Sequence, residues 1–117
     1  MNIRRRLKSF KYAANGIKII FQEEPNARIH LIATLLVILS GFIFQLSFFE
    51  WIIVVFCIGL VFSMELINTA LERMANYISP EYHETIKRVK DLSAAAVLVS
   101  AVVAIITAIL IFVPKIG

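Results

Sequence analysis

The sequence lacks most of the residue patterns that small soluble proteins use to hold a fold or a cofactor together. Its only cysteine is Cys57, which excludes a disulfide framework and a cysteine-rich zinc site. The four glycines form neither GxxxxGK(S/T) nor GxGxxG, so the sequence has no glycine-rich phosphate loop. The two histidines, His30 and His83, do not have the spacing of zinc ligands. Any bound nucleotide would have to be held by side chains and a metal ion.

Charged residues are also scarce. They make up 17% of the 117 residues, whereas apolar residues make up 60%, and the mean hydropathy is +0.85. Soluble domains have about 25% charged residues and about 45–50% apolar ones. A chain this short cannot bury so much apolar surface in a core of its own. The composition therefore excludes an ordinary soluble globule, a disordered chain and a nucleic-acid partner inferred from pI alone, and it indicates an integral membrane protein.

Three apolar stretches approach or exceed the roughly 20 residues that a membrane-spanning helix needs. They cover residues 29–49, 51–72 and 92–113. The first and third carry no formal charge, and the middle one is apolar as far as Met64. It then continues as ELINTALERM, which contains neither glycine nor proline and keeps helical character. We expect one all-α membrane domain over residues 1–117.

The N-terminal segment, residues 3–24, predicts an amphipathic surface helix. Its apolar residues recur at steps of four and three, which places them on one helical stripe: Ile3, Leu7, Phe10, Ala14, Ile17 and Phe21. Lysines and arginines lie off that stripe, so the helix would rest among lipid headgroups. A basic tail that only sets the topology is the alternative. Pro25 should end this helix and start the first span.

The distribution of cations predicts the orientation in the membrane. Seven lysines and arginines precede the first span, four lie between residues 73 and 90, and none lies in the turn between the first two spans. The positive-inside rule then places the N-terminus and the 74–90 loop in the cytoplasm, as for a protein of the bacterial inner membrane.

Three polar residues on the second span are candidates for catalysis. Glu65, Asn68 and Glu72 follow the spacing i, i+3 and i+7, so they share one helical face. Glu65 lies roughly 21 Å along the helix from Trp51, still inside an apolar slab of about 30 Å. A carboxylate at that depth is costly unless it is paired or hydrated, and it suits a general base. The alternative is a helix end that has already left the bilayer.

Further charged groups are expected near the same cytoplasmic plane. Topology brings Glu24, Glu72, Lys90 and Asp91 to this level. Carboxylate oxygens suit Mg²⁺, and lysine and arginine suit phosphate. The combination indicates magnesium-dependent phosphoryl transfer to an acceptor in the bilayer. Two alternatives remain open, namely paired charges at helix ends and a small transporter or assembly subunit with an intramembrane acid.

Two segments carry a resemblance to a known family. FSMELINTALE and SPEYHETIKRVKDLSAAAVL resemble the small bacterial membrane diacylglycerol kinases and undecaprenol kinases. The resemblance implies a homotrimer of three-span subunits with active sites between subunits, which transfers the γ-phosphate of ATP to a lipid hydroxyl. It departs from the enterobacterial pattern at Ser93-Ala94, where those diacylglycerol kinases carry Gly-Ser.

The resemblance also implies roles for individual residues. Glu65 would be the catalytic base, Glu24 and Glu72 would bind Mg²⁺, and Asn68 would orient the base or the metal shell. Arg28 would lie near the lipid headgroup, together with Glu65 and Asn68. ATP contacts would come from residues of the surface helix, the cytoplasmic loop and the start of the third span: Arg5, Tyr12, Glu24, Glu72, Glu81, Tyr82, His83, Lys90 and Asp91.

The motifs leave the lipid undecided. FSMELINTALE and IFVPKIG are closer to the undecaprenol kinase branch, whereas EYHE is closer to the diacylglycerol branch. We expect diacylglycerol, giving phosphatidic acid, with undecaprenol as the alternative.

Overall fold

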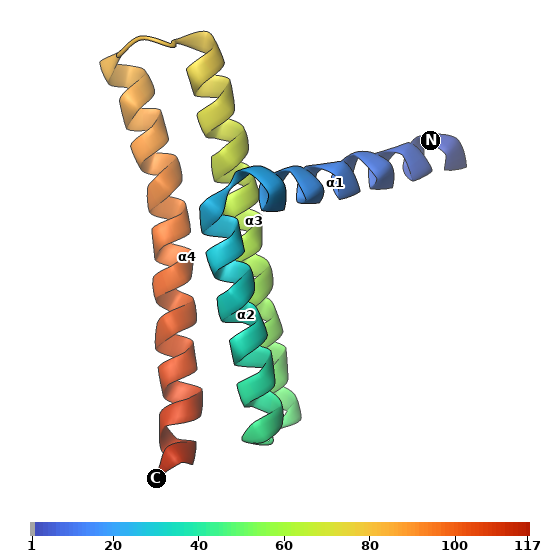
Figure 1. Cartoon of the computed structure of the whole chain (residues 1–117), viewed down its shortest axis with the longest axis vertical. Helices are drawn as coiled ribbons and strands as arrows, with labels where there is room; N and C mark the ends of the chain where they lie inside the picture. Colours follow the sequence, from blue (N-terminus) through green and yellow to red (C-terminus); the bar gives the residue numbers. More distant parts are fainter. Residues whose placement is uncertain (1) are drawn as a thin grey trace.

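A computed structural model describes residues 2–117, and helices make up almost all of this part of the chain. The elements are α1 (Ile3–Glu23), α2 (Pro25–Ile43), α3 (Phe48–Ile78) and α4 (Glu84–Ile116). The last three are long and apolar enough to cross a membrane. The expected all-α membrane fold with three candidate spans is therefore confirmed. Figure 1 shows α2, α3 and α4 running roughly side by side, with α1 pointing away from them.

The corner between α1 and α2 falls at Glu24 and Pro25. Proline fits the first turn of a helix because its missing N–H has no partner there in any case, and Pro25 is indeed the first residue of α2. Only the last turns of α1 pack on the bundle: Ile20 is buried, and the Phe21 ring meets Phe62 of α3 edge-on at 5.7 Å. The helical form of residues 3–23 follows the sequence pattern, and its place among lipid headgroups stays a prediction.

The turn between α2 and α3 is tight and capped on both sides. The Leu46 N–H donates to the Gly41 carbonyl at 3.0 Å and the Gln45 N–H to the Phe42 carbonyl at 3.4 Å, while Gln45 adopts a positive φ of 54°. This is a Schellman ending. Ser47 and Glu50 then form a capping box that starts α3. This turn ends α2 at Ile43, and Pro25 begins it. The first spanning helix therefore begins and ends earlier than the expected 29–49.

The helices α3 and α4 are longer than the expected spans of 51–72 and 92–113. Their 31 and 33 residues correspond to about 46 Å and 50 Å, against an apolar slab of about 30 Å. The loop that the sequence placed at 74–90 shrinks to residues 79–83. The helix continues because no residue between 84 and 92 breaks it, and because ion pairs at i and i+4 support its exposed turns: Lys87–Asp91 and Arg88–Glu84.

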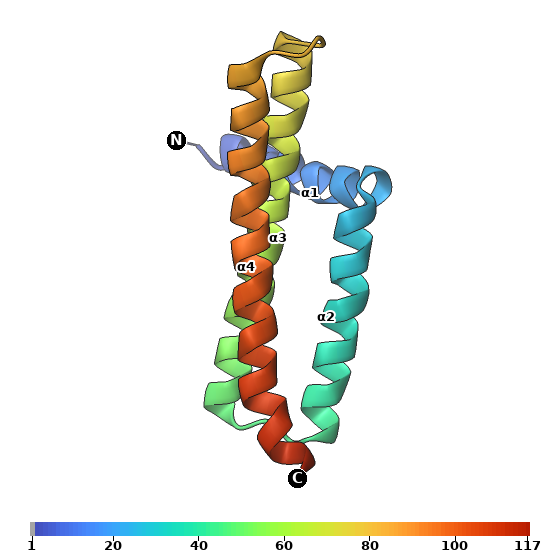
Figure 2. The ribbon, with the colours of Figure 1, turned by 90° about the vertical axis from the view of Figure 1, so that its left-hand side faces the viewer.

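The helices α3 and α4 lie against each other along their length, and α2 lies beside α3 (Figure 2). A small apolar core of Leu46, Val54 and Ile111 closes the bundle beside the α2–α3 turn. There, Lys115 Nζ pairs with Glu50 Oε1 at 3.1 Å. Many other apolar side chains are exposed in the single chain, as helices that face hydrocarbon or other subunits require.

Candidate functional site

Glu65 is the most deeply buried charged residue among those the structure describes. It lies on α3 with 3% of its surface exposed. His30 of α2 approaches it, with 3.0 Å between His30 Nε2 and Glu65 Oε1. The contact lacks the geometry of a straight hydrogen bond, so Oε1 has no hydrogen-bond partner within residues 2–117.

A second polar group lies one turn further along α3. The Asn68 amide nitrogen donates to Glu72 Oε1 at 3.3 Å. The Ser93 hydroxyl, from α4, donates to Asn68 Oδ1 at 2.8 Å. Ser93 is 8% exposed, so this link is shielded from water. Ser93 therefore fixes which way the Asn68 amide points, and Asn68 in turn fixes one oxygen of Glu72.

The corner between α1 and α2 is attached to α3 by Arg73. Its two terminal nitrogens lie 3.3 Å from a carboxylate oxygen of Glu23 and 3.3 Å from one of Glu24. Arg28 of α2 reaches back to the end of α1, where its Nε donates to the Phe21 carbonyl at 2.7 Å and its Nη2 to the Gln22 carbonyl. A cation at these carbonyls favours the end of α1. In this chain Arg28 thus stabilises the corner, and its expected place near the lipid headgroup stays a prediction.

An apolar groove of about 330 Å³ runs between α2, α3 and α4. Its walls are mainly aliphatic side chains, and His30 is one of the few polar residues that line it. His30, which lines the groove, also contacts Glu65. A lipid chain in the groove would bring its polar end to this pair.

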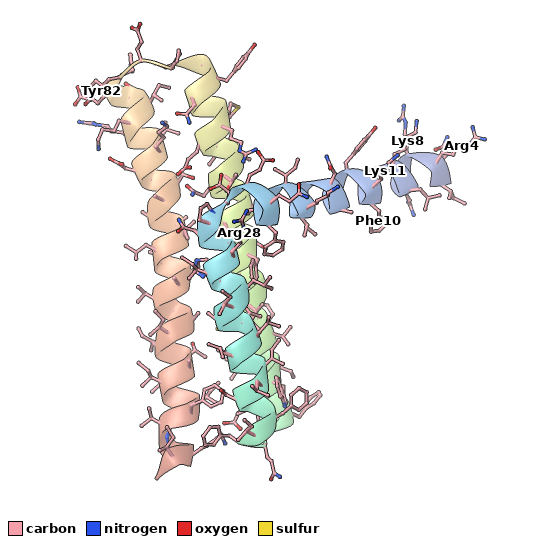
Figure 3. All side chains as sticks on the ribbon, viewed as in Figure 1. Arg4, Lys8, Phe10, Lys11, Arg28 and Tyr82 are labelled. Carbon is pink, nitrogen blue, oxygen red and sulfur yellow. The ribbon has the colours of Figure 1, made fainter. Side chains whose placement is uncertain are left out.

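The remaining predicted residues lie outside this cluster. Arg5 and Tyr12 are exposed residues of α1, the helix that points away from the bundle in Figure 1. Figure 3 shows Tyr82 at the tip of the α3–α4 hairpin. Beside Tyr82, His83 accepts a hydrogen bond from the Thr85 N–H at 3.2 Å and so caps α4. Asp91 pairs with Lys87 at 2.7 Å. The other two residues in this group are exposed Glu81 and half-buried Lys90.

Three residues of the site were not predicted from the sequence. They are His30 of α2, Ser93 of α4 and Arg73 of α3. Each is defined by a contact with another helix, and helical periodicity carries no signal for such contacts. A histidine in an otherwise uncharged span is the one feature that could have directed attention to His30.

Glu24 and Glu72 are the two carboxylates that the family resemblance assigns to a magnesium ion. Within the described residues no three His, Cys, Asp or Glu side chains form a closed metal cluster. Mg²⁺ is commonly held by one or two carboxylates and completes its shell with water and substrate phosphates. Arg73 follows Glu72 on α3 and contacts Glu24 at the α1–α2 corner. The two carboxylates therefore lie on neighbouring elements. The donor set fits this ion.

The fold and the cluster define a small membrane protein of three candidate spans with a buried acid. Comparison with known families gives its class: residues 11–112 match the model of the prokaryotic diacylglycerol kinase family. The chain belongs to this family and is a lipid kinase with ATP as phosphoryl donor. This assignment favours the enzyme over the transporter or assembly subunit.

Individual relatives are of two kinds. The chain is 41% identical to the undecaprenol kinase of Bacillus subtilis over 113 residues, which is 97% of this chain and 92% of the relative. It is 36% identical to the diacylglycerol kinase of Synechocystis over 86% of this chain and 58% of that protein. It is 30% identical to the diacylglycerol kinase of Escherichia coli K12 over 86% of this chain and 83% of the relative.

The link from Ser93 to Asn68 predicts an effect on activity. We expect Ser93→Ala to lower lipid kinase turnover about three- to tenfold, since a buried hydrogen bond contributes about 1 kcal/mol and 1.4 kcal/mol is a factor of ten. Turnover is measured in detergent micelles. Ser100→Ala is the control, because the Ser100 hydroxyl bonds only the Val97 carbonyl of its own helix. Equal turnover in the two variants would contradict the role of Ser93.

Proposed function

We propose that this chain transfers the γ-phosphate of ATP to the hydroxyl of undecaprenol in the bacterial inner membrane, with Glu65 as the general base. The observation that carries this proposal is the position of Glu65, a buried carboxylate in contact with His30, which itself lines an apolar groove. A carboxylate there can accept a proton from a lipid hydroxyl without competing water.

The choice of lipid rests on the relatives. The motifs leave the lipid undecided, and the expectation of diacylglycerol follows the general label of the family. The similarity to the Bacillus subtilis undecaprenol kinase is both higher and longer than that to the Escherichia coli diacylglycerol kinase. Diacylglycerol is the second candidate, supported by the EYHE segment at residues 81–84 and by the names of several relatives.

The proposed transfer forms one bond to the γ-phosphorus, breaks another and moves one proton. The hydroxyl oxygen forms a bond to the γ-phosphorus as its own O–H bond breaks, and Glu65 takes the proton. The bond from the γ-phosphorus to the bridging oxygen breaks, and ADP leaves with that electron pair. Such a reaction needs little covalent chemistry from the protein, which has to position the reactants and neutralise charge.

Glu24 and Glu72 are proposed to hold Mg²⁺ at the cytoplasmic end of this site. A bound Mg²⁺ would neutralise phosphate charge and orient the triphosphate. The hydrogen bond from Asn68 leaves the second oxygen of Glu72 free for the ion. The Arg73 contact holds the Glu24 carboxylate toward α3.

ATP contacts are proposed for the residues named in the family resemblance, namely Arg5, Tyr12, Glu81, Tyr82, His83, Lys90 and Asp91. Within one chain, the N-terminal half of α1 and the tip of the α3–α4 hairpin do not converge on Glu65 (Figure 1). A homotrimer in which neighbouring subunits complete each site accounts for this separation. With the N-terminus in the cytoplasm, the site opens on the inner leaflet.

A competition assay tests the lipid. The purified protein is reconstituted in vesicles with equal amounts of undecaprenol and diacylglycerol and supplied with Mg²⁺ and ATP labelled with radioactive phosphorus at the γ position. Because both lipids compete for one hydroxyl site, the label reports which lipid the enzyme prefers. We expect most of the label in undecaprenyl phosphate after thin-layer separation. Label mainly in phosphatidic acid would assign diacylglycerol instead, and an unlabelled lipid fraction would overturn both proposed acceptors.

The base role of Glu65 predicts the behaviour of Glu65→Gln. The amide keeps the shape of the side chain but cannot accept the proton, so we expect lipid phosphorylation to fall at least about a hundredfold. ATP binding and the thermal unfolding midpoint should stay close to wild type. Glu50→Gln is the matched control, since Glu50 lies on the same helix and pairs with Lys115 at the opposite end of the bundle. Unchanged turnover in Glu65→Gln would remove Glu65 from the base role.

The metal ligands are tested by titration with Mg²⁺. Glu24→Gln and Glu72→Gln should each raise the Mg²⁺ concentration at half-maximal activity by roughly tenfold or more, because each removes one anionic ligand. Glu84→Gln is the control, since Glu84 is exposed and pairs with Arg88. If neither titration curve shifts relative to that control, the two carboxylates do not bind the ion.

A further inference from the structure

The contact between His30 and Glu65 has no counterpart in the roles assigned above. His30 is the sixth residue of α2, and its Nε2 lies 3.0 Å from Glu65 Oε1 on α3. The Glu65 side chain is 4% exposed and that of His30 is 25% exposed. Within residues 2–117, His30 is the one side chain found at hydrogen-bond or ion-pair distance from Glu65.

A buried carboxylate oxygen needs a hydrogen-bond donor. Leaving such an oxygen unpaired costs more free energy than an ordinary hydrogen bond contributes. The cost is higher still when the buried group is charged. Oε1 has no correctly aligned donor, whereas an imidazole N–H already lies at the correct distance. Rotation of the ring about its χ2 torsion, which is broad for histidine, would direct that N–H at the oxygen.

We propose that His30 is a positioning residue for Glu65. The imidazole Nε2–H donates a hydrogen bond to Oε1, which leaves the other carboxylate oxygen to take the proton of the lipid hydroxyl. This hydrogen bond holds the carboxylate in one orientation. This proposal rests on the proposed base role of Glu65.

The α1–α2 corner explains why His30 lies where it does. Pro25 begins α2, Arg28 binds the carbonyls at the end of α1, and Arg73 holds Glu24 against α3. These contacts fix the rotation of α2 about its axis. His30 lies about one and a half turns past the corner, so a small error in that rotation would remove its ring from Glu65.

The surrounding charges leave His30 and Glu65 as a separate pair. Glu24 is paired with Arg73, Arg28 with carbonyls of α1, and Asp91 with Lys87. Glu72 lies two turns further along α3 and accepts from Asn68. Lys90 is half-buried on α4. Within the described residues, Glu65 is the carboxylate that pairs with His30.

The kinetic test uses His30→Ala and His30→Gln. We expect kcat to fall roughly ten- to a hundredfold in His30→Ala, with the KM for lipid changed less than about twofold, because the lost hydrogen bond acts on the base and involves a charged group. The Gln side-chain amide can donate from nearly the same place as Nε2, so His30→Gln should recover most of the loss. Ser40→Ala, also on α2 but far from Glu65, is the control.

Two kinetic results would overturn the proposal. The first is a loss in His30→Gln as large as in His30→Ala, since a donor would then not be what matters. The second is a rise in KM with an unchanged kcat, which would make His30 a lipid-binding residue only. Thermal unfolding of each variant in micelles excludes variants that have simply failed to fold.

A spectroscopic measurement separates this proposal from the proposed function. The chain has two histidines, so nitrogen-15 NMR of the imidazole rings in lipid vesicles gives two sets of signals, which a His83→Asn variant assigns. We expect Glu65→Gln to shift the His30 ring signals and leave those of His83 in place. Unshifted His30 signals would mean that the two side chains do not interact. This readout needs no activity, so it holds even if neither lipid is phosphorylated.

Discussion

A carboxylate kept out of water at the junction of three helices is the constraint on which the rest of this structure depends. Because a buried charge is costly, Glu65 needs a polar partner, and His30 of α2 lies against it. One turn further along α3, Ser93 of α4 donates to Asn68, which in turn donates to Glu72. Each contact requires its helix to present one particular face. The site and the packing of the bundle therefore determine each other, and the long apolar surfaces are left for hydrocarbon or other subunits.

The number and type of the helices could be predicted because hydrophobic length alone identifies a span. The position of the corner could also be predicted, since Pro25 fits the first turn of a helix better than any interior position. The residues at which the helices end were harder to predict. The ending of α2 depends on a positive φ at Gln45 and on the Ser47–Glu50 capping box. The early start of α4 depends on His83 acting as a cap. Such local hydrogen bonds outweigh the hydropathy that set the expected boundaries.

The candidate site also has one part that could be predicted from the sequence and one that could not. Glu65, Asn68 and Glu72 lie on one helix, so their common face follows from periodicity alone. Contacts between helices depend on the rotation of each helix about its axis, and that rotation is set by packing. The roles of Arg73, Ser93 and His30 therefore emerged only with the fold. The ATP contacts expected on α1 and on the hairpin rest on the family resemblance, and a single chain leaves Arg5 and Tyr12 well away from Glu65.

The unequal lengths of the spans have a consequence for the membrane that can host this protein. The 19 residues of α2 extend about 28 Å, close to the thickness of the hydrocarbon layer. The helices α3 and α4 are several turns longer than that thickness. A thicker bilayer would thus be mismatched to α2 first. Since α2 carries His30 and is anchored by the corner, the strain would be felt beside Glu65. Acyl-chain length in the host membrane becomes a variable that acts on the enzyme through its shortest crossing helix.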